Sequence, residues 1–183
     1  QVTVVVRYGA AAGTLSGRSV LVSLAGTTRV GTTAADGRVS VTLPVSGLPG
    51  STTLTAGYAG DAQTGPSSVS RPFTITKSPT RLVLSNLTGA PSSFTATLTG
   101  GRGGPMLGRT VTFVLTGLGA VAGQTAIVPT VTDVLGRAVL GPVALPAGRY
   151  TLTARFLGTV AAPGGGSVTL TDPTYSGSSV STT

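Results

Sequence analysis

Residues 145–158 read LPAGRYTLTARFLG, and the segment 149–156 within them decides the fold of this chain. Every second residue from Tyr150 to Phe156 is apolar, while Arg and Thr occupy the positions between. Period-two alternation places one set of side chains on each face of an extended segment, so it predicts a strand with one buried and one wet face. Threonine suits the wet face because its β-branch fits the pleat and its hydroxyl can face water.

The same alternation recurs along the whole chain and is bounded by glycine and proline. No stretch of the sequence sustains the 3.6-residue period of an amphipathic helix. The predicted strands lie at 2–8, 18–24, 38–43, 54–58 and 73–76 in the first half, and at 81–84, 94–98, 110–115, 137–140 and 150–156 in the second. Short strands at this spacing, with polar turns between them, predict an all-β fold of antiparallel sandwiches.

The two halves of the chain repeat one scheme in the same order. GRSV at 17–20 matches GRTV at 108–111, and LTAGYAG at 54–60 matches LTARFLG at 152–158. A Gly-Arg pair follows an Asp in a turn at 36–38 and at 133–137, and SSVS occurs at 67–70 and 178–181. Glycine-rich insertions near 118–124 and 159–169 account for the changes in spacing. The repeat predicts two tandem sandwiches, residues 1–76 and residues 77–183.

The two predicted domains are joined by a short linker at residues 76–80, TKSPT. Pro79 fixes its own φ and restricts the backbone of Ser78. A linker this short and stiff favours an extended end-to-end arrangement over free tumbling.

Each predicted domain lacks one strand that the other has. The first begins directly at the counterpart of the 94–98 strand, so it lacks an opening strand like 81–84. The second reaches Thr183 where a closing strand like 73–76 would begin. Either the chain is a window on a longer tandem array, or it is a subunit that polymerises when a neighbour supplies a strand. An unfilled gap would leave an exposed edge, which promotes aggregation.

Three strings carry a family resemblance: GRTVTFVLTG at 108–117, LPAGRYTLTARFLG at 145–158 and LTAGYAGDAQTGPSS at 54–68. They resemble the bacterial immunoglobulin-like domain repeats of large exported surface proteins, over nearly the whole chain. The resemblance implies an immunoglobulin-like sandwich fold, an extracellular or cell-surface location, and a role as stalk or spacer in adhesins. The chain departs from the pattern at Thr52, where the second copy has Tyr150, and at Thr159, where the first has Asp61; a second match, DPTY at 172–175, follows the insertion.

The composition excludes most catalytic and metal-binding chemistry. The 183 residues include no His, no Cys and no Trp, and the four acidic residues are all Asp. Ser-His and Cys-His nucleophiles, disulfides and the common metal sites are therefore ruled out. Asp36 and Asp133 are typical of turns. We predict no enzyme activity, no cofactor and no metal site, and the single lysine, Lys77 in the linker, excludes a Lys–Asn isopeptide staple.

The net charge of +8 arises from Arg residues spread singly along the chain, without a basic run. This distribution argues against a specific nucleic-acid site. No apolar run approaches the ~18 residues of a membrane span, so no membrane insertion is expected.

The glycine-rich segment 100–105 lacks the ending of a phosphate loop, and 117–123 lacks the spacing of a dinucleotide fingerprint, so both are predicted to be hairpin loops.

The remaining candidate residues are partner contacts. Arg149, directly before the predicted 150–156 strand, and Arg155 within it fall on the outward face, and Arg102 lies in a glycine-rich loop. They either contact an acidic surface polysaccharide or simply solubilise an exposed sheet. The loops 100–105, 117–124 and 159–167 are the expected contact regions, because loops at the ends of sandwiches commonly bind partners. Asn86 begins an Asn-Leu-Thr glycosylation sequon.

Three functional hypotheses follow. The first is a non-enzymatic extracellular structural protein, a rigid tandem spacer whose partners are neighbouring domains. The second is a filament, sheath or surface-layer subunit that joins identical subunits by strand exchange. The third is a glycan- or polyanion-binding module that uses the glycine-rich loops and scattered Arg residues.

Overall fold

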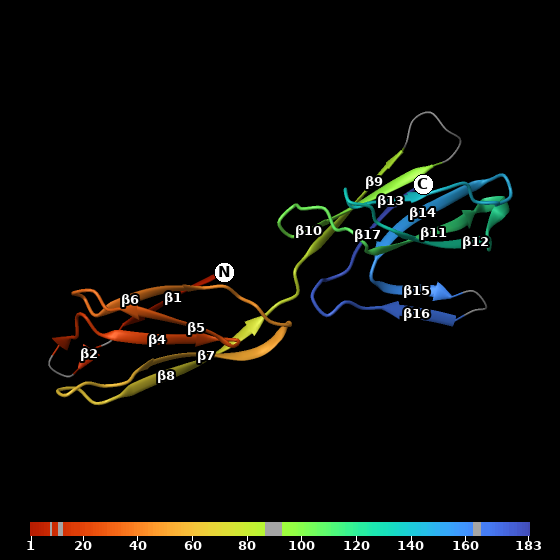
Figure 1. Cartoon of the computed structure of the whole chain (residues 1–183). Helices are drawn as coiled ribbons and strands as arrows, with labels where there is room; N and C mark the ends of the chain where they lie inside the picture. The colour runs from red at the N-terminus through yellow and green to blue at the C-terminus, as the bar shows by residue number, and fades with distance from the viewer. Residues whose placement is uncertain (8, 11–12, 87–92, 163–165) are drawn as a thin grey trace. The chain divides into compact units, whose positions relative to one another are not determined.

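The computed structural model of the chain describes all residues from 1 to 183 except 8, 11–12, 87–92 and 163–165. The chain divides into two compact units, Gln1–Thr76 and Lys77–Thr183. Regular structure in the described residues is β-strand throughout, apart from one 3-10 turn at Gly119–Val121 (Figure 1). The predicted all-β antiparallel architecture is confirmed. Within the described part of the chain, no helix is long and apolar enough to cross a membrane.

The first unit is built from two antiparallel sheets that face each other. One pairs β1 (Val2–Arg7) with β6 (Arg38–Leu43). The other has the order β5 (Thr27–Thr32), β4 (Ser19–Leu24), β7 (Gly50–Tyr58) and β8 (Ser67–Ile75). A small hairpin joins β2 (Gly9–Ala10) to β3 (Gly13–Thr14). Alternate residues of both sheets meet in one core, whose most buried members include Val22, Leu24 and Leu43.

The second unit has the same two layers with one more strand in the first. That sheet has the order β13 (Arg137–Leu140), β10 (Phe94–Gly100) and β9 (Thr80–Asn86). The facing sheet has the order β12 (Thr125–Val131), β11 (Thr110–Leu118), β14 (Arg149–Phe156) and β17 (Ser178–Thr182). The core between them is centred on the fully buried Phe113. Each unit is therefore a β-sandwich.

The strand registers show that the two units are copies of one plan. In the first unit Val22 lies opposite Ala56, and in the second Phe113 lies opposite Ala154, which are the positions the sequence repeat equates. The two insertions take regular structure. Residues 117–124 contain the 3-10 turn, and the region expected to be a loop at 159–167 forms a hairpin of β15 (Gly158–Ala162) and β16 (Gly166–Leu170).

The strand deficits differ from the prediction at one end. Among the described residues no strand pairs with the outer edge of β1, where the first unit was expected to lack an opening strand. The second unit does have a closing strand, which corrects the prediction. Val180 of β17 lies opposite Ala154 just as Val69 of β8 lies opposite Ala56. The closing strand starts at the SSVS motif itself, and its polar composition conceals the alternation.

Candidate functional site at a corner of the second unit

An Arg–Asp pair closes the corner between β11 and the segment that leads into β17. Arg109, one residue before β11, reaches Asp172 with 3.2 Å between Nη1 and Oδ2. The guanidinium group also lies over the ring of Tyr175, 5.2 Å from its centroid. Oδ1 of Asp172 accepts the backbone N–H groups of Thr174 and Tyr175 at 2.7 and 3.0 Å. The carboxylate therefore folds residues 172–175 into a tight turn and ties it to β11.

The first unit repeats this corner with its own residues. Arg18 forms the equivalent ion pair with Asp61, whose Oδ1 accepts the N–H groups of Gln63 and Thr64 at 2.9 and 2.7 Å. The β15–β16 hairpin is inserted between the strand end and this Asp in the second unit only, so Asp172 takes the place of Asp61 despite the sequence gap.

Both carboxyl groups are held ionised. A hydrogen bond from the Tyr58 hydroxyl, then N–H donation from Gln63 and Thr64 and the charge of Arg18, lower the pKa of Asp61 to about 2. At Asp172 burial acts to raise the pKa, but the N–H groups of the turn and the nearby Arg109 and Lys77 outweigh it and leave the pKa below its ordinary value. These carboxylates are acceptors within a structural turn.

A buried threonine fixes the arginine of each corner. The hydroxyl of Thr132 accepts the backbone N–H of Arg109 at 2.9 Å and donates to the carbonyl of Met106 at 2.5 Å. Thr33 makes the same two contacts with Arg18 and Leu15. Sequence reasoning missed both threonines. Their common spacing, four residues before the glycine of each Gly-Arg turn, is a signal that the repeat could have shown.

The expected linker at 76–80 is bound to the second unit from Lys77 onward. Ser78 forms a parallel bridge with Tyr175: its N–H donates to the carbonyl of Thr174 at 2.9 Å, and its carbonyl accepts the N–H of Ser176 at 3.0 Å. Lys77 Nζ donates to the carbonyl of Asp172 at 2.8 Å. We call residues 77–80 and 172–178 together the junction clamp.

Thr80 completes the junction clamp with its side chain. Its hydroxyl lies 2.8 Å from the carbonyl of Ser176 and 2.9 Å from the hydroxyl of Ser178. The ion pair between Arg109 and Asp172 fixes residues 172–178 of the clamp, and residues 77–80 continue directly into β9. The clamp is therefore connected to the core sheets on both sides.

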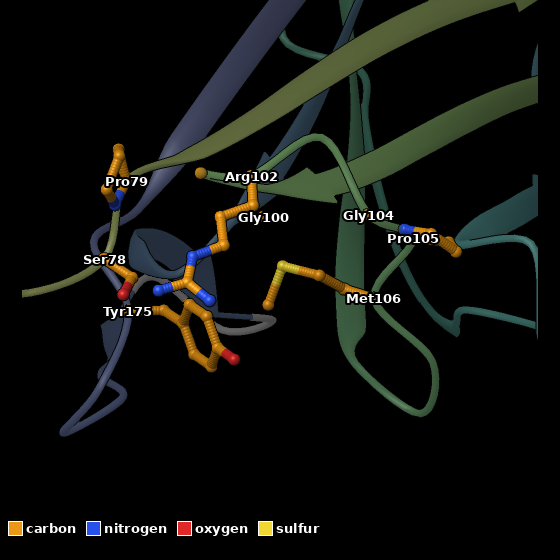
Figure 2. A pocket seen from close by; sticks show the side chains of 9 residues that line it. Ser78, Pro79, Gly100, Arg102, Gly104, Pro105, Met106 and Tyr175 are labelled. Carbon is orange, nitrogen blue, oxygen red and sulfur yellow. The ribbon is translucent and has the colours of Figure 1, made fainter. Parts of the chain in front are cut away.

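A pocket of about 510 Å³ opens beside the clamp (Figure 2). It is lined by Ser78 and Pro79, by the loop 100–106 and by Tyr175. Figure 2 shows the guanidinium end of Arg102 and the sulfur of Met106 directed toward the Tyr175 ring. The loop 100–106 can lie against Pro79 only because Gly101 has no side chain. A Cβ at Gly101 would lie 2.9 Å from Cγ of Pro79. The pocket combines an exposed cation with an aromatic face.

The three predicted contact arginines do not form one patch. Arg149 pairs with Leu118, at the end of β11 opposite to the corner. The nine residues of β11 separate the two ends by about 26 Å at 3.3 Å per residue. Arg155 does lie on the outward face with Arg149, as predicted, but its Nη1 donates to the carbonyl of Thr159 at 3.0 Å. Only Arg102 lies at a pocket with Tyr175.

Other predicted residues have plain structural places. Asp36 and Asp133 accept the N–H groups of Arg38 and Arg137 at 3.0 and 2.8 Å, which confirms them as turn residues. Asn86 is the last residue of β9, and the rest of its sequon, 87–88, lies outside the described residues. No cluster of three or more metal-ligating side chains occurs in the portion of the chain that is described.

Comparison with known proteins gives a likeness to a solved structure but to no family. No family model matches the chain, and no curated protein does either. A solved structure described as a tetra-tandem repeat in the extending region of a large adhesion protein is similar over 92% of this chain and 42% of that chain, with 20% identity and a TM-score of 0.41. The assignment to bacterial immunoglobulin-like repeats stays a prediction.

Proposed function

We propose that this chain is a non-enzymatic pair of immunoglobulin-like repeats that acts outside the cell as a tension-bearing spacer of an adhesin-type surface protein. The repeat of one plan in two units supports this reading, because tandem copies of a domain extend a polypeptide without adding a chemical site. The single observation that carries the proposal is the parallel geometry of the junction clamp.

Parallel pairing makes the clamp resistant to pulling along the chain. Tension through the chain ends draws residues 77–80 toward their N-terminal side and residues 174–178 toward their C-terminal side. The two segments run in the same direction, so they must slide past each other, and their hydrogen bonds bear the load together. A pair pulled apart from one end would instead lose its bonds one at a time. The clamp thus places its bonds where a spacer needs them.

The test is single-molecule stretching of the full chain through its two ends. Because the chain has no native Cys, introduced terminal cysteines give unique attachment points. The second unit is recognised by its longer step, since unfolding releases at most about 3.6 Å per residue and this unit has more residues. Forced unfolding reports the barrier and therefore the clamp bonds that break first.

Thr80→Val removes both hydroxyl contacts of the clamp and keeps a β-branched side chain. We expect the second unit to unfold at a lower force in this variant. Thr116→Val is the matched control, because Thr116 is an exposed strand residue far from the clamp. Equal unfolding forces for the two variants would contradict the proposal.

A second function, recognition of an acidic polysaccharide, is favoured by the pocket at Tyr175. An aromatic ring offers a stacking face for a sugar, and the guanidinium of Arg102 can pair bidentately with a carboxylate or sulfate. Retention on heparin-agarose tests it. Arg102→Ala should elute at lower salt than Arg149→Ala, which removes the same charge far from the pocket. Identical elution of the two variants would exclude the pocket as the site.

A further inference from the structure

The outer edge of β1 lacks a neighbour that the second unit shows in place. β1 pairs with β6 along one edge, and no described strand pairs with the other. In the second unit the equivalent strand, β10, pairs with β13 on one side and with β9 on the other, over seven residues. The first unit therefore has an unpaired edge where its copy has a strand.

The registers define what would sit at this edge. Arg7 opposite Arg38 corresponds to Thr97 opposite Arg137, so Val6 of β1 takes the place of Ala96 in β10. In the second unit Leu84 of β9 lies opposite Ala96. An incoming strand would thus place an apolar residue opposite Val6, at the register position that Leu84 occupies in the second unit.

Three valines beside this edge are only partly covered. Val2 and Val6 pack against the core of the first unit but are only half-buried. Val69 of β8 is 48% exposed, whereas its counterpart Val180 packs against the core. The difference follows from β9, which lies against β17 in the second unit and has no described equivalent beside β8. One missing strand accounts for the partial exposure of Val2 and Val6 and for the exposure of Val69.

We propose that the first unit binds an extended strand of the chemistry of β9, with apolar residues at alternate positions, antiparallel along β1 and against β8. The sequence of β9, TRLVLSN, fits because Leu82 and Leu84 face the core, whereas Arg81, Val83 and Ser85 are exposed on the other face. The backbone supplies affinity through ladder hydrogen bonds, and the alternate apolar residues supply selectivity. This binding is independent of the tension-bearing role, since it concerns the other unit and a different edge.

The experiment adds the missing strand to the intact chain. Val4 corresponds to Phe94, so Gln1 corresponds to residue 91, and a copy of residues 80–90 placed before Gln1 reproduces the connection of the second unit. A short connection gives the added strand a high effective concentration at the edge. The matched control carries Leu82→Asp and Leu84→Asp in the added copy only. The unmodified chain is the reference, so no native residue is altered.

Residue-resolved amide hydrogen exchange is the readout. We expect the β1 amides to exchange about tenfold or more slowly with the apolar copy, and the first unit to melt at a higher temperature than in the Asp control. Equal exchange in the two versions would overturn the proposal. So would concentration-dependent dimerisation of the unmodified chain with protection of β1, because a second copy would then be the occupant of this edge.

Discussion

Thr132→Val tests whether a buried hydroxyl organises the corner of the second unit. Thr132 is 2% exposed, and its hydroxyl both accepts the N–H of Arg109 and donates to the carbonyl of Met106. Valine has nearly the same shape but leaves both backbone groups without a partner. A buried group that loses its partner costs about 1–3 kcal/mol, so two such groups should cost the second unit about 2–6 kcal/mol of unfolding free energy.

Urea titration monitored by circular dichroism, with hydrogen exchange to separate the two units, measures this loss. The midpoint for the second unit should fall without a change in the denaturant slope, and that for the first unit should stay unchanged. Thr116→Val provides the control, because an exposed strand threonine should shift stability by no more than about 0.5 kcal/mol. If the two variants unfold alike, the reasoning about the buried hydroxyl is refuted.

Three further outcomes follow from the same structure. The pKa of Asp61 is lowered to about 2 from 3.8, so the stability that this carboxylate gives the first unit is present above about pH 4 and is lost as pH falls toward 2. Asp61→Asn should therefore flatten the pH dependence of the melting temperature, and an unaltered dependence would exclude the carboxylate as its source. Thr95 is buried, with no partner for its hydroxyl among the described residues, so Thr95→Val should raise unfolding free energy by about 1 kcal/mol; a loss in the denaturant midpoint would count against this. Gly136 has a φ of 72°, and a Cβ there would lie 2.5 Å from the carbonyl oxygen of Leu98. Gly136→Ala should therefore destabilise the second unit by more than about 1 kcal/mol. A variant that unfolds in urea at the same midpoint as the wild type would refute this.

The sequence predicts the inner strands well because both their faces and both their edges constrain them. β4, β11 and β14 have a neighbouring strand on each side and place alternate apolar residues in the core, and this burial produces the alternation itself. The strands that sequence reasoning missed are edges. In β5, Val30 is 62% exposed, and β12 contains Pro129, which an edge strand tolerates. β17 is equally polar. An edge strand buries few side chains, so apolar and polar residues hardly alternate in its sequence.

The corner was partly predictable. The match of Asp172 to Asp61 was visible in the sequence and is confirmed by their Arg partners, Arg109 and Arg18. Residue type alone does not reveal the roles of Thr33 and Thr132, because a buried threonine and a solvent-facing one look alike in a chain rich in threonine; only their common spacing before the Gly-Arg turns marks them. The parallel pairing of the junction with 174–176 is a contact across the length of the second unit, which no local pattern encodes.

The direction dependence of the unfolding force tests the spacer account most directly. Within the full chain, cysteine handles at Lys77 and Thr183 shear the junction clamp, whereas handles at Lys77 and Thr171 peel it open from one end. Both pairs share the Lys77 substitution, so the difference isolates the geometry of loading. The account predicts a clearly higher unfolding force for the second unit in the shearing direction. Equal forces, or a higher force on peeling, would contradict it.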